Sequence, residues 1–278
     1  MMELFNSERF SFLPTVKRSR GHKHFAVLLV VLLVLASQLV VLWFVPSVNA
    51  NPTTIFSEGF ESGNFNAWRS KEDLPPNRTA SVQSDVKHHG TYAARFFRNV
   101  AGGGGALRIG KDVTAMSEWY FRTYVLFESL AWASGGQARL FGPDNAAVGA
   151  TGTLLYLYKQ SGTYKWRFAY RNAGAWTYVL FTTPAITTGT WYCLEVHVII
   201  NAGSGVAEFW IDGTLKGSYT GLNNADRGNA VRFFVGYGFN DGYTPSGDTS
   251  LIHDCVVIAD TYIGLEPPPE EGVLVQVI

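Results

Sequence analysis

Apolar and polar side chains alternate along much of the chain after residue 50, most clearly between residues 191 and 198. There an apolar set alternates with a mixed set: Tyr192, Leu194, Val196 and Val198 against Trp191, Cys193, Glu195 and His197. A period of two predicts a strand with one buried face and one mixed face. A Gly-rich turn at 201–205 and a second alternating run follow, and Asp212-Gly213 ends that run with a dipeptide typical of tight turns. These residues predict a central β-hairpin.

Further apolar runs recur at intervals of roughly a dozen residues, which is typical of an antiparallel sandwich. Strands are predicted within 55–68, 80–86, 92–97, 107–113, 118–127, 138–141, 153–159, 164–171, 176–181, 230–236 and 251–259. His88-His89-Gly90 lies between two of these runs. Adjacent side chains of a strand point to opposite faces, so we interpret the two histidines as part of a turn rather than as a metal site. The pattern as a whole predicts an all-β fold.

The amino-terminal part of the chain has a different composition. Residues 1–24 include the basic run Lys17-Arg-Ser-Arg-Gly-His-Lys23, and residues 25–45 are apolar apart from Ser37 and Gln38. An apolar run of this length can cross a bilayer, and basic flanks stay in the cytoplasm. Val48-Asn49-Ala50 is a small-residue cleavage site, so residues 25–50 are predicted to be a signal peptide or a membrane anchor. The following domain, residues 51–265, is expected outside the cytoplasm, secreted or membrane-anchored.

Composition narrows the choice of partners. The chain has 22 basic and 22 acidic side chains and a formal net charge of zero. Nucleic-acid binding requires a basic face, so no nucleic-acid partner is expected. Residues 266–278 begin with the run Glu-Pro-Pro-Pro-Glu-Glu and are predicted to form a separate tail, because proline cannot donate a hydrogen bond inside a sheet.

Two features depend on export, a possible disulfide and a possible glycosylation site. Cys193 and Cys255 are the only cysteines, and they lie on two different predicted strands. An oxidising compartment permits a disulfide between them; the alternative is two buried free thiols. Zinc is not expected, because neither cysteine has a close partner of the Cys-x-x-Cys kind. Asn77-Arg78-Thr79 is a glycosylation sequon, which matters only in a compartment that glycosylates.

Three stretches together carry a resemblance to a known group. They are the hairpin from Trp191 to Gly213, the opening run Phe56–Gly63 with Trp68, and the closing run Ile252–Asp260 with Tyr262, Ile263 and Gly264. In this order they resemble the laminin-G-like, concanavalin A-like lectin and glucanase group. The resemblance implies a two-sheet antiparallel jelly-roll sandwich whose partner is a polysaccharide, another glycan or a surface protein.

The choice of candidate catalytic residues depends on one assumption about which strands pair. If the strands of Cys193 and Cys255 pair, Glu195, His197 and His253 share one sheet face and could transfer protons, with Arg122 neutralising a substrate carboxylate. A solvated sheet face also carries polar side chains without any catalytic role. The Glu-x-Asp-x-Glu strand of the related glucanases is absent, and the Arg-rich and Gln-x-His strands of jelly-roll alginate lyases are matched only in part. We therefore expect no catalysis and keep the enzyme as an alternative.

Binding residues are predicted on the same hairpin. Trp210 is flanked by Glu208 and Asp212 and is a candidate platform for a sugar ring, together with Trp191 and Arg232.

The resemblance also implies a structural Ca²⁺ between the first and last strands, where Glu58 and Asp254 fall. Alternation places Asp254 on an apolar face with Ile252, Val256 and Ile258, so its charge requires a partner. The alternative is an Asp with a purely structural hydrogen-bonding role.

The sequence thus predicts a non-catalytic, extracytoplasmic module that binds carbohydrate or mediates surface adhesion. Two alternatives remain. One is a polysaccharide lyase or glycoside hydrolase of the same fold, and the other is a structural cell-surface protein, held at the membrane by residues 25–45.

Overall fold

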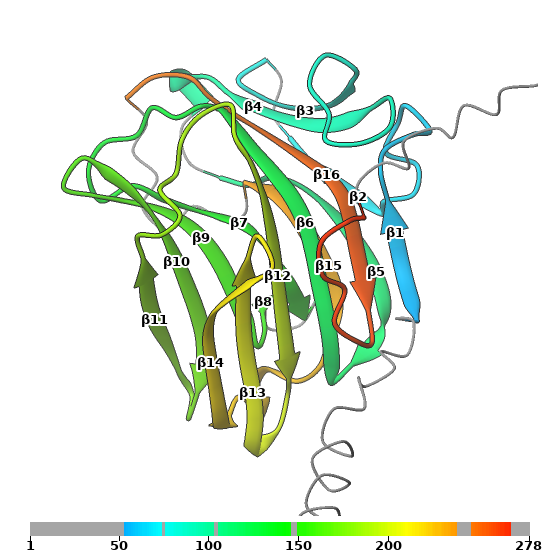
Figure 1. Cartoon of the computed structure of the whole chain (residues 1–278), viewed down its shortest axis with the longest axis vertical. Coiled ribbons are helices and arrows are strands. Elements are labelled where there is room, and N and C mark those ends of the chain that lie inside the picture. The colour runs from blue at the N-terminus through cyan, green and yellow to red at the C-terminus, as the bar shows by residue number, and fades with distance from the viewer. Residues whose placement is uncertain (1–52, 74–75, 103–104, 146–148, 238–245, 268–278) are drawn as a thin grey trace, which may run out of the picture. The chain divides into compact units, whose positions relative to one another are not determined.

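The computed structural model of the chain describes residues 53–73, 76–102, 105–145, 149–237 and 246–267. In these residues, two antiparallel sheets of eight strands each contain almost all of the regular structure (Figure 1). The predicted membrane or signal segment and most of the predicted tail lie outside the described residues. Within the described residues, no helix is both long enough and apolar enough to span a membrane.

Sheet A contains the predicted hairpin near one edge. In spatial order its strands are β14 (Thr214–Asn223), β13 (Ala202–Ile211), β12 (Trp191–Ile199), β6 (Glu118–Ser129), β16 (Thr249–Ala259), β4 (Ala93–Arg98) and β3 (Arg78–Gln83), and β1 (Thr54–Glu58) also pairs with β16. The turn between β13 and β14 has φ values of 50° at Asp212 and 71° at Gly213, as the central residues of a type I′ turn do. The predicted hairpin and its tight turn are confirmed.

Sheet B contains the strands predicted in the middle of the chain. In spatial order they are β11 (Ala175–Phe181), β10 (Thr163–Asn172), β9 (Thr153–Gln160), β7 (Gln137–Asn145), β15 (Ala230–Tyr237), β5 (Leu107–Met116) and β2 (Ser70–Glu72), and the short β8 (Gly149–Ala150) pairs with β7. Two short 3₁₀ helices, η1 (Val100–Gly102) and η2 (Ala225–Arg227), lie between strands. The all-β, two-sheet class is therefore confirmed.

The core lies between the inner faces of the two sheets. The apolar set of β12 enters it as the alternation predicts, because Tyr192, Leu194, Val196 and Val198 are all buried. Phe121 of sheet A meets Phe141 and Phe233 of sheet B edge to face, with ring centroids 5.1 Å apart in both pairs. Aromatic pairs of this geometry add to the free energy gained by burying apolar area.

A bulge in β16 breaks the alternation that the sequence predicts. Cys255 has a φ of 51°, and the register between β16 and β6 shifts between Asp254 and Val257. Such a bulge exposes consecutive residues to the same side of the sheet. As a result His253 points into the core, where it packs against Phe96, whereas Cys255 belongs to a cluster on the outer face. The prediction that the two residues share a face is wrong for this reason.

The strand order also excludes the predicted disulfide. Cys193 pairs with Tyr124 on β6, and Tyr124 pairs with Asp254, so a complete strand separates the two cysteines. Two strand spacings amount to about 9–10 Å, and a disulfide needs Cα atoms within about 7 Å. Both residues are buried free thiols. The pairing prediction is therefore wrong, and the alternative of two buried thiols is confirmed.

We expect no cross-link between Cys193 and Cys255, even in protein that has passed through an oxidising compartment, because Tyr124 lies between them. Peptide mapping without reduction should find both cysteines unlinked, and thiol labelling should require denaturation. Recovery of the linked peptide pair in a stoichiometric amount would contradict the strand order β12-β6-β16.

Candidate functional site

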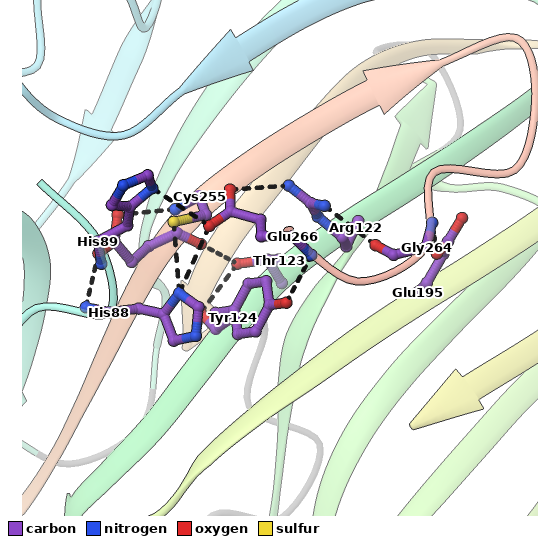
Figure 2. A network of polar contacts seen from close by, with 10 residues as sticks. His88, His89, Arg122, Thr123, Tyr124, Glu195, Cys255, Gly264 and Glu266 are labelled. Atoms are coloured by element: carbon purple, nitrogen blue, oxygen red, sulfur yellow. Dashed lines mark hydrogen bonds and ion pairs between the residues drawn. The ribbon is translucent and has the colours of Figure 1, made fainter. Parts of the chain in front are cut away.

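The outer face of sheet A is partly covered by the segment that follows β16. Glu195 accepts hydrogen bonds from the backbone N–H groups of Ile263 at 2.8 Å and Gly264 at 2.9 Å. Arg122 donates to the carbonyl oxygen of Gly264 at 3.0 Å and to the Glu266 carboxylate at 3.1 Å (Figure 2). Glu195 and Arg122 therefore bind the chain itself. We call residues 260–267 the C-terminal strap.

Burial under this strap affects the ionisation of Glu195. Only 2% of the residue is exposed, and burial raises the pKa of its carboxyl, while the two backbone N–H groups and Arg122 oppose that rise. A buried carboxylate needs such partners to stay charged. These contacts explain why a carboxylate is buried at position 195, and no substrate is needed to explain it.

The two histidines predicted to act with Glu195 lie in different environments. His197 is on the same outer face, between Glu208 at 2.9 Å and Glu118 at 3.2 Å, and its ring stacks on Tyr120. His253 is fully buried on the inner face, where its Nδ1 lies 3.0 Å from the Thr123 hydroxyl, and burial lowers its pKa to about 3. The predicted grouping on one face is wrong, because the bulge at Cys255 turns His253 inward.

The predicted sugar-binding residues do not form one surface either. Trp210 is half-buried and packs against Tyr262 of the strap, with ring centroids 5.4 Å apart. Trp191 meets the ring of His88 edge to face on the same sheet. Arg232 lies on sheet B instead, where it donates to Asp112 at 2.7 Å. The two tryptophans and the arginine are thus on different sheets.

The residues predicted to bind calcium have protein partners. Asp254 accepts backbone N–H bonds from His88, His89 and Cys255 at 2.8, 3.2 and 2.7 Å, and these partly offset the rise in its pKa caused by burial. Glu58 accepts from the N–H of Phe60 at 2.6 Å. These bonds supply the partner that a buried carboxylate at position 254 requires. Calcium binding here stays a prediction.

Glycosylation at Asn77 also stays a prediction. Its side-chain oxygen accepts a hydrogen bond from Asn99 at 2.9 Å, directly before β3.

The outer face of sheet B carries a cluster of cationic and aromatic side chains. They alternate with core residues along the strands: Arg108, Arg139, Arg167, Arg171 and Arg232, with Tyr156, Tyr158, Trp176, Tyr178 and Phe234. Arg167 lies 3.9 Å from the ring centroid of Tyr178 and 5.1 Å from that of Tyr158. Arg108 and Arg171 lie over Phe234 and Trp176 in the same way. Repeated cation–π pairs hold these arginine side chains against aromatic rings on this face.

One buried acid lies on the same face. Asp144 is 7% exposed, and its Oδ2 lies 4.0 Å from Arg108. In the described structure its Oδ1 has no hydrogen-bond partner. Burial raises the pKa of this carboxyl, and the charges of Arg108, Arg232 and Arg139 oppose that rise. A buried carboxyl with a shifted pKa beside specific charged partners marks a candidate functional site.

Sequence reasoning missed this face because it searched for catalytic groups on the central hairpin. The signal was present: basic and aromatic residues share the polar phase of the strands at 153–159, 164–171 and 176–181. Only the pairing of Ala169 with Tyr178, and of Arg167 with Tyr156, brings these residues onto one surface.

The comparisons with known proteins bear on the fold. No protein-family model matches the chain, and no curated protein sequence matches it. The structure is similar to that of the cellulose-induced protein Cip1, with 20% identity and a TM-score of 0.53 over 76% of this chain and 100% of that one. It is also similar to alginate lyase vAL-1 from Chlorella virus, with 10% identity and a TM-score of 0.52 over 75% of this chain and 100% of that one. These neighbours are jelly-roll sandwiches of the concanavalin A-like type, so the likeness supports the predicted two-sheet sandwich fold and no finer assignment.

We expect Glu195→Gln to lower the free energy of unfolding by about 1–3 kcal/mol, because an amide cannot accept from both Ile263 and Gly264 and leaves a buried donor unsatisfied. Urea unfolding monitored by tryptophan fluorescence would measure the change. The matched control is Glu118→Gln, since Glu118 is half-exposed and should change stability little. Equal stability of Glu195→Gln and the wild type would contradict the conclusion that Glu195 holds the strap through these two hydrogen bonds.

The burial of His253 predicts a pH effect on stability. Its pKa is about 3 in the folded state and about 6.5 in the unfolded state, so between these values only the unfolded state takes up the proton. Stability should therefore fall as the pH drops below about 6.5, by up to about 1.4 kcal/mol per unit from this residue alone. We expect His253→Phe to flatten that slope in urea titrations from pH 7 to pH 4. An exposed-site control, His89→Asn, should keep it, and an unchanged slope in His253→Phe would contradict the assignment.

Proposed function

We propose that the domain is an extracytoplasmic carbohydrate-binding module whose ligand, an acidic polysaccharide, lies across the outer face of sheet B. The observation that carries the proposal is the arginine–tyrosine platform at the β9-β10-β11 end of the sheet. Arg167 is half-buried between Tyr158 and Tyr178, and Tyr178 is 44% exposed. A flat ring beside a fixed guanidinium matches a sugar ring that carries a carboxylate.

The charge of this face favours an anionic ligand. Arg167 contacts the neutral side chain of Gln137, whereas Arg108, Arg171 and Arg232 each have a carboxylate within 4.0 Å. An arginine without a carboxylate partner keeps its charge available to a ligand, and a planar guanidinium can bind a carboxylate through two parallel hydrogen bonds. Arg167 is therefore the residue we assign to a uronate carboxylate.

The other sheet offers a poorer surface for a polysaccharide. The strap covers Glu195 and Arg122, which were predicted as catalytic residues, and part of Trp210, which was predicted to bind sugar. Glycan binding at Trp210 would require Tyr262 to move. We place the ligand on sheet B for this reason.

The neighbouring structures support a function linked to polysaccharides. One is described as a cellulose-induced protein and the other as an alginate lyase. Because their identity to this chain is low, only the fold can be compared. The proposed chemistry of the ligand is therefore inferred from the residues of sheet B. Surface adhesion is a more specific version of this proposal. In that version the face binds a glycan carried by a partner surface, as in laminin-G-like modules.

A second candidate function is a polysaccharide lyase, and one observation favours it. Asp144 is a buried carboxyl with a raised pKa and an unpartnered oxygen, and it lies near Arg108, Arg139 and Arg232. β-Elimination needs a proton-transfer group and a cation that neutralises the uronate carboxylate. This face has both kinds of group. The histidine and glutamate first considered for catalysis lie on sheet A.

Binding to immobilised alginate and polygalacturonate would test the first proposal. We expect Arg167→Ala and Tyr178→Ala each to weaken retention by roughly fivefold to tenfold, because each removes part of the cation–π pair. Higher salt should weaken binding of the wild type, as it does for charge-dependent association. Tyr262→Ala is the matched control, since Tyr262 is 42% exposed but lies on the strap over sheet A.

Two outcomes would overturn this assignment. One is equal loss of binding in Tyr178→Ala and Tyr262→Ala, and the other is equal retention on the neutral glucan laminarin. Release of unsaturated sugar ends by the wild type, absent in Asp144→Asn, would replace the binding module with the lyase.

A further inference from the structure

The turn after β3, which is distant in sequence, meets two consecutive segments near the end of the described chain on the outer side of β16, on the sheet opposite to the proposed polysaccharide face. These two segments are the bulge of β16 and the strap (Figure 2). His88 Nδ1, Cys255 Sγ and a carboxylate oxygen of Glu266 lie within 4.8 Å of one another. His89 also directs its Nδ1 to Glu266, at 3.5 Å. Imidazole, thiol and carboxylate groups thus converge on one point.

Two separations between these atoms are compatible with coordination of one shared ion. The distance from Cys255 Sγ to His88 Nδ1 is 3.7 Å, which is also within reach of a weak sulfur hydrogen bond, and that from His88 Nδ1 to Glu266 Oε2 is 3.6 Å. The nitrogen–oxygen distance is longer than the roughly 3.2 Å at which hydrogen bonds of that kind end. In a tetrahedral site with bonds of about 2.0–2.3 Å, neighbouring ligand atoms are about 3.3–3.8 Å apart. The observed distances fall in that interval.

Neighbouring side chains hold the backbone of the turn and of the bulge in place. The carboxylate of Asp254 accepts the backbone N–H groups of His88, His89 and Cys255, so one side chain fixes the turn and the bulge together. Groups that orient the ligands in this way are a regular feature of metal sites.

Glu266 and His88 are fixed as well. Arg122 binds Oε1 of Glu266, which leaves Oε2 facing the histidines, and the backbone N–H of Glu266 donates to the Tyr124 hydroxyl at 2.9 Å. The ring of His88 stacks on Tyr124 with centroids 3.7 Å apart. Both side chains are therefore oriented before any ion binds.

The cluster is open to solvent on one side. A cavity of about 410 Å³ is lined by His88, His89 and Glu266, and a second of about 200 Å³ is lined by His89, Cys255 and Glu266. His89 is 60% exposed, so its ring is free to turn toward the cluster or away from it. An ion has an entry path, and a fourth coordination position is available to His89 or to water.

We propose that His88, Cys255 and Glu266 form a binding site for a transition-metal ion of the zinc class, with His89 or water as the fourth ligand. Thiolate and imidazole ligands select zinc-like ions, whereas Ca²⁺ and Mg²⁺ prefer oxygen ligands alone. The site differs from the predicted calcium site and from the polysaccharide face. A bound ion would link the turn, β16 and the strap, and would thereby stabilise the folded chain.

Titration of the full-length protein with Zn²⁺ by calorimetry would test the site, after treatment with a chelator and its removal. We expect one ion per chain and a higher melting temperature. With Co²⁺ we expect a thiolate charge-transfer band. Cys255→Ser and His88→Phe should each weaken affinity by more than about tenfold, because loss of a group that merely orients a metal ligand already costs about that much. His88→Phe keeps a ring on Tyr124, so folding should be preserved.

Cys193→Ser is the matched control, because Cys193 is a second buried thiol that lines the larger cavity but is not one of the three ligand residues. It should bind both ions like the wild type and keep the cobalt–thiolate band. Absence of stoichiometric Zn²⁺ binding would overturn the proposal. So would equal affinity of the wild type and His88→Phe, loss of binding in Cys193→Ser, or displacement of Zn²⁺ by an equal concentration of Ca²⁺.

Discussion

The carboxylate of Asp254 is the constraint on which much of this molecule depends. It is buried on the outer side of β16 and accepts three backbone N–H groups, two from the turn at His88-His89 and one from Cys255 in its own strand. A buried carboxylate without such donors would be costly, and so would the unpaired N–H groups of the bulge and the turn. By satisfying both, Asp254 stabilises a bulge that directs His253 into the core and Cys255 outward.

The bulge has consequences beyond its own strand. It places the Cys255 thiol beside the His88 ring and beneath the strap, where burial and the charges of Asp254 and Glu266 raise the pKa of the thiol. For Glu266 burial also raises the pKa, but its contacts with His88 and Cys255 and the charge of Arg122 outweigh burial and lower the pKa to about 2. Glu266 is thus ionised near neutral pH, whereas the thiol retains its proton until a cation or a base is present.

The two outer faces of the sandwich differ because, among the described residues, the strap lies on sheet A. On sheet A, Glu195 and Arg122 bind the backbone of residues 263–264 and the Glu266 side chain, so their charges are used within the chain. On sheet B, Arg167 contacts Gln137 and two tyrosine rings, and its charge stays accessible at a half-exposed position. The same residue types therefore bind the chain itself on one face and stay accessible on the other, which is the face where we propose that a ligand binds.

The sequence by itself determined the all-β class, the position of most strands, the central hairpin and the inward set Tyr192, Leu194, Val196 and Val198, because alternation and turn residues are local properties of the chain. It could not determine the strand order β12-β6-β16, which separates the two cysteines, or the bulge that moves His253 to the opposite face. Pairing and register depend on contacts between residues far apart in sequence. For the same reason only the tertiary structure decided that the strap covers Glu195, that the arginines and tyrosines of β9, β10 and β11 share one surface, and that His88 and Glu266 meet Cys255.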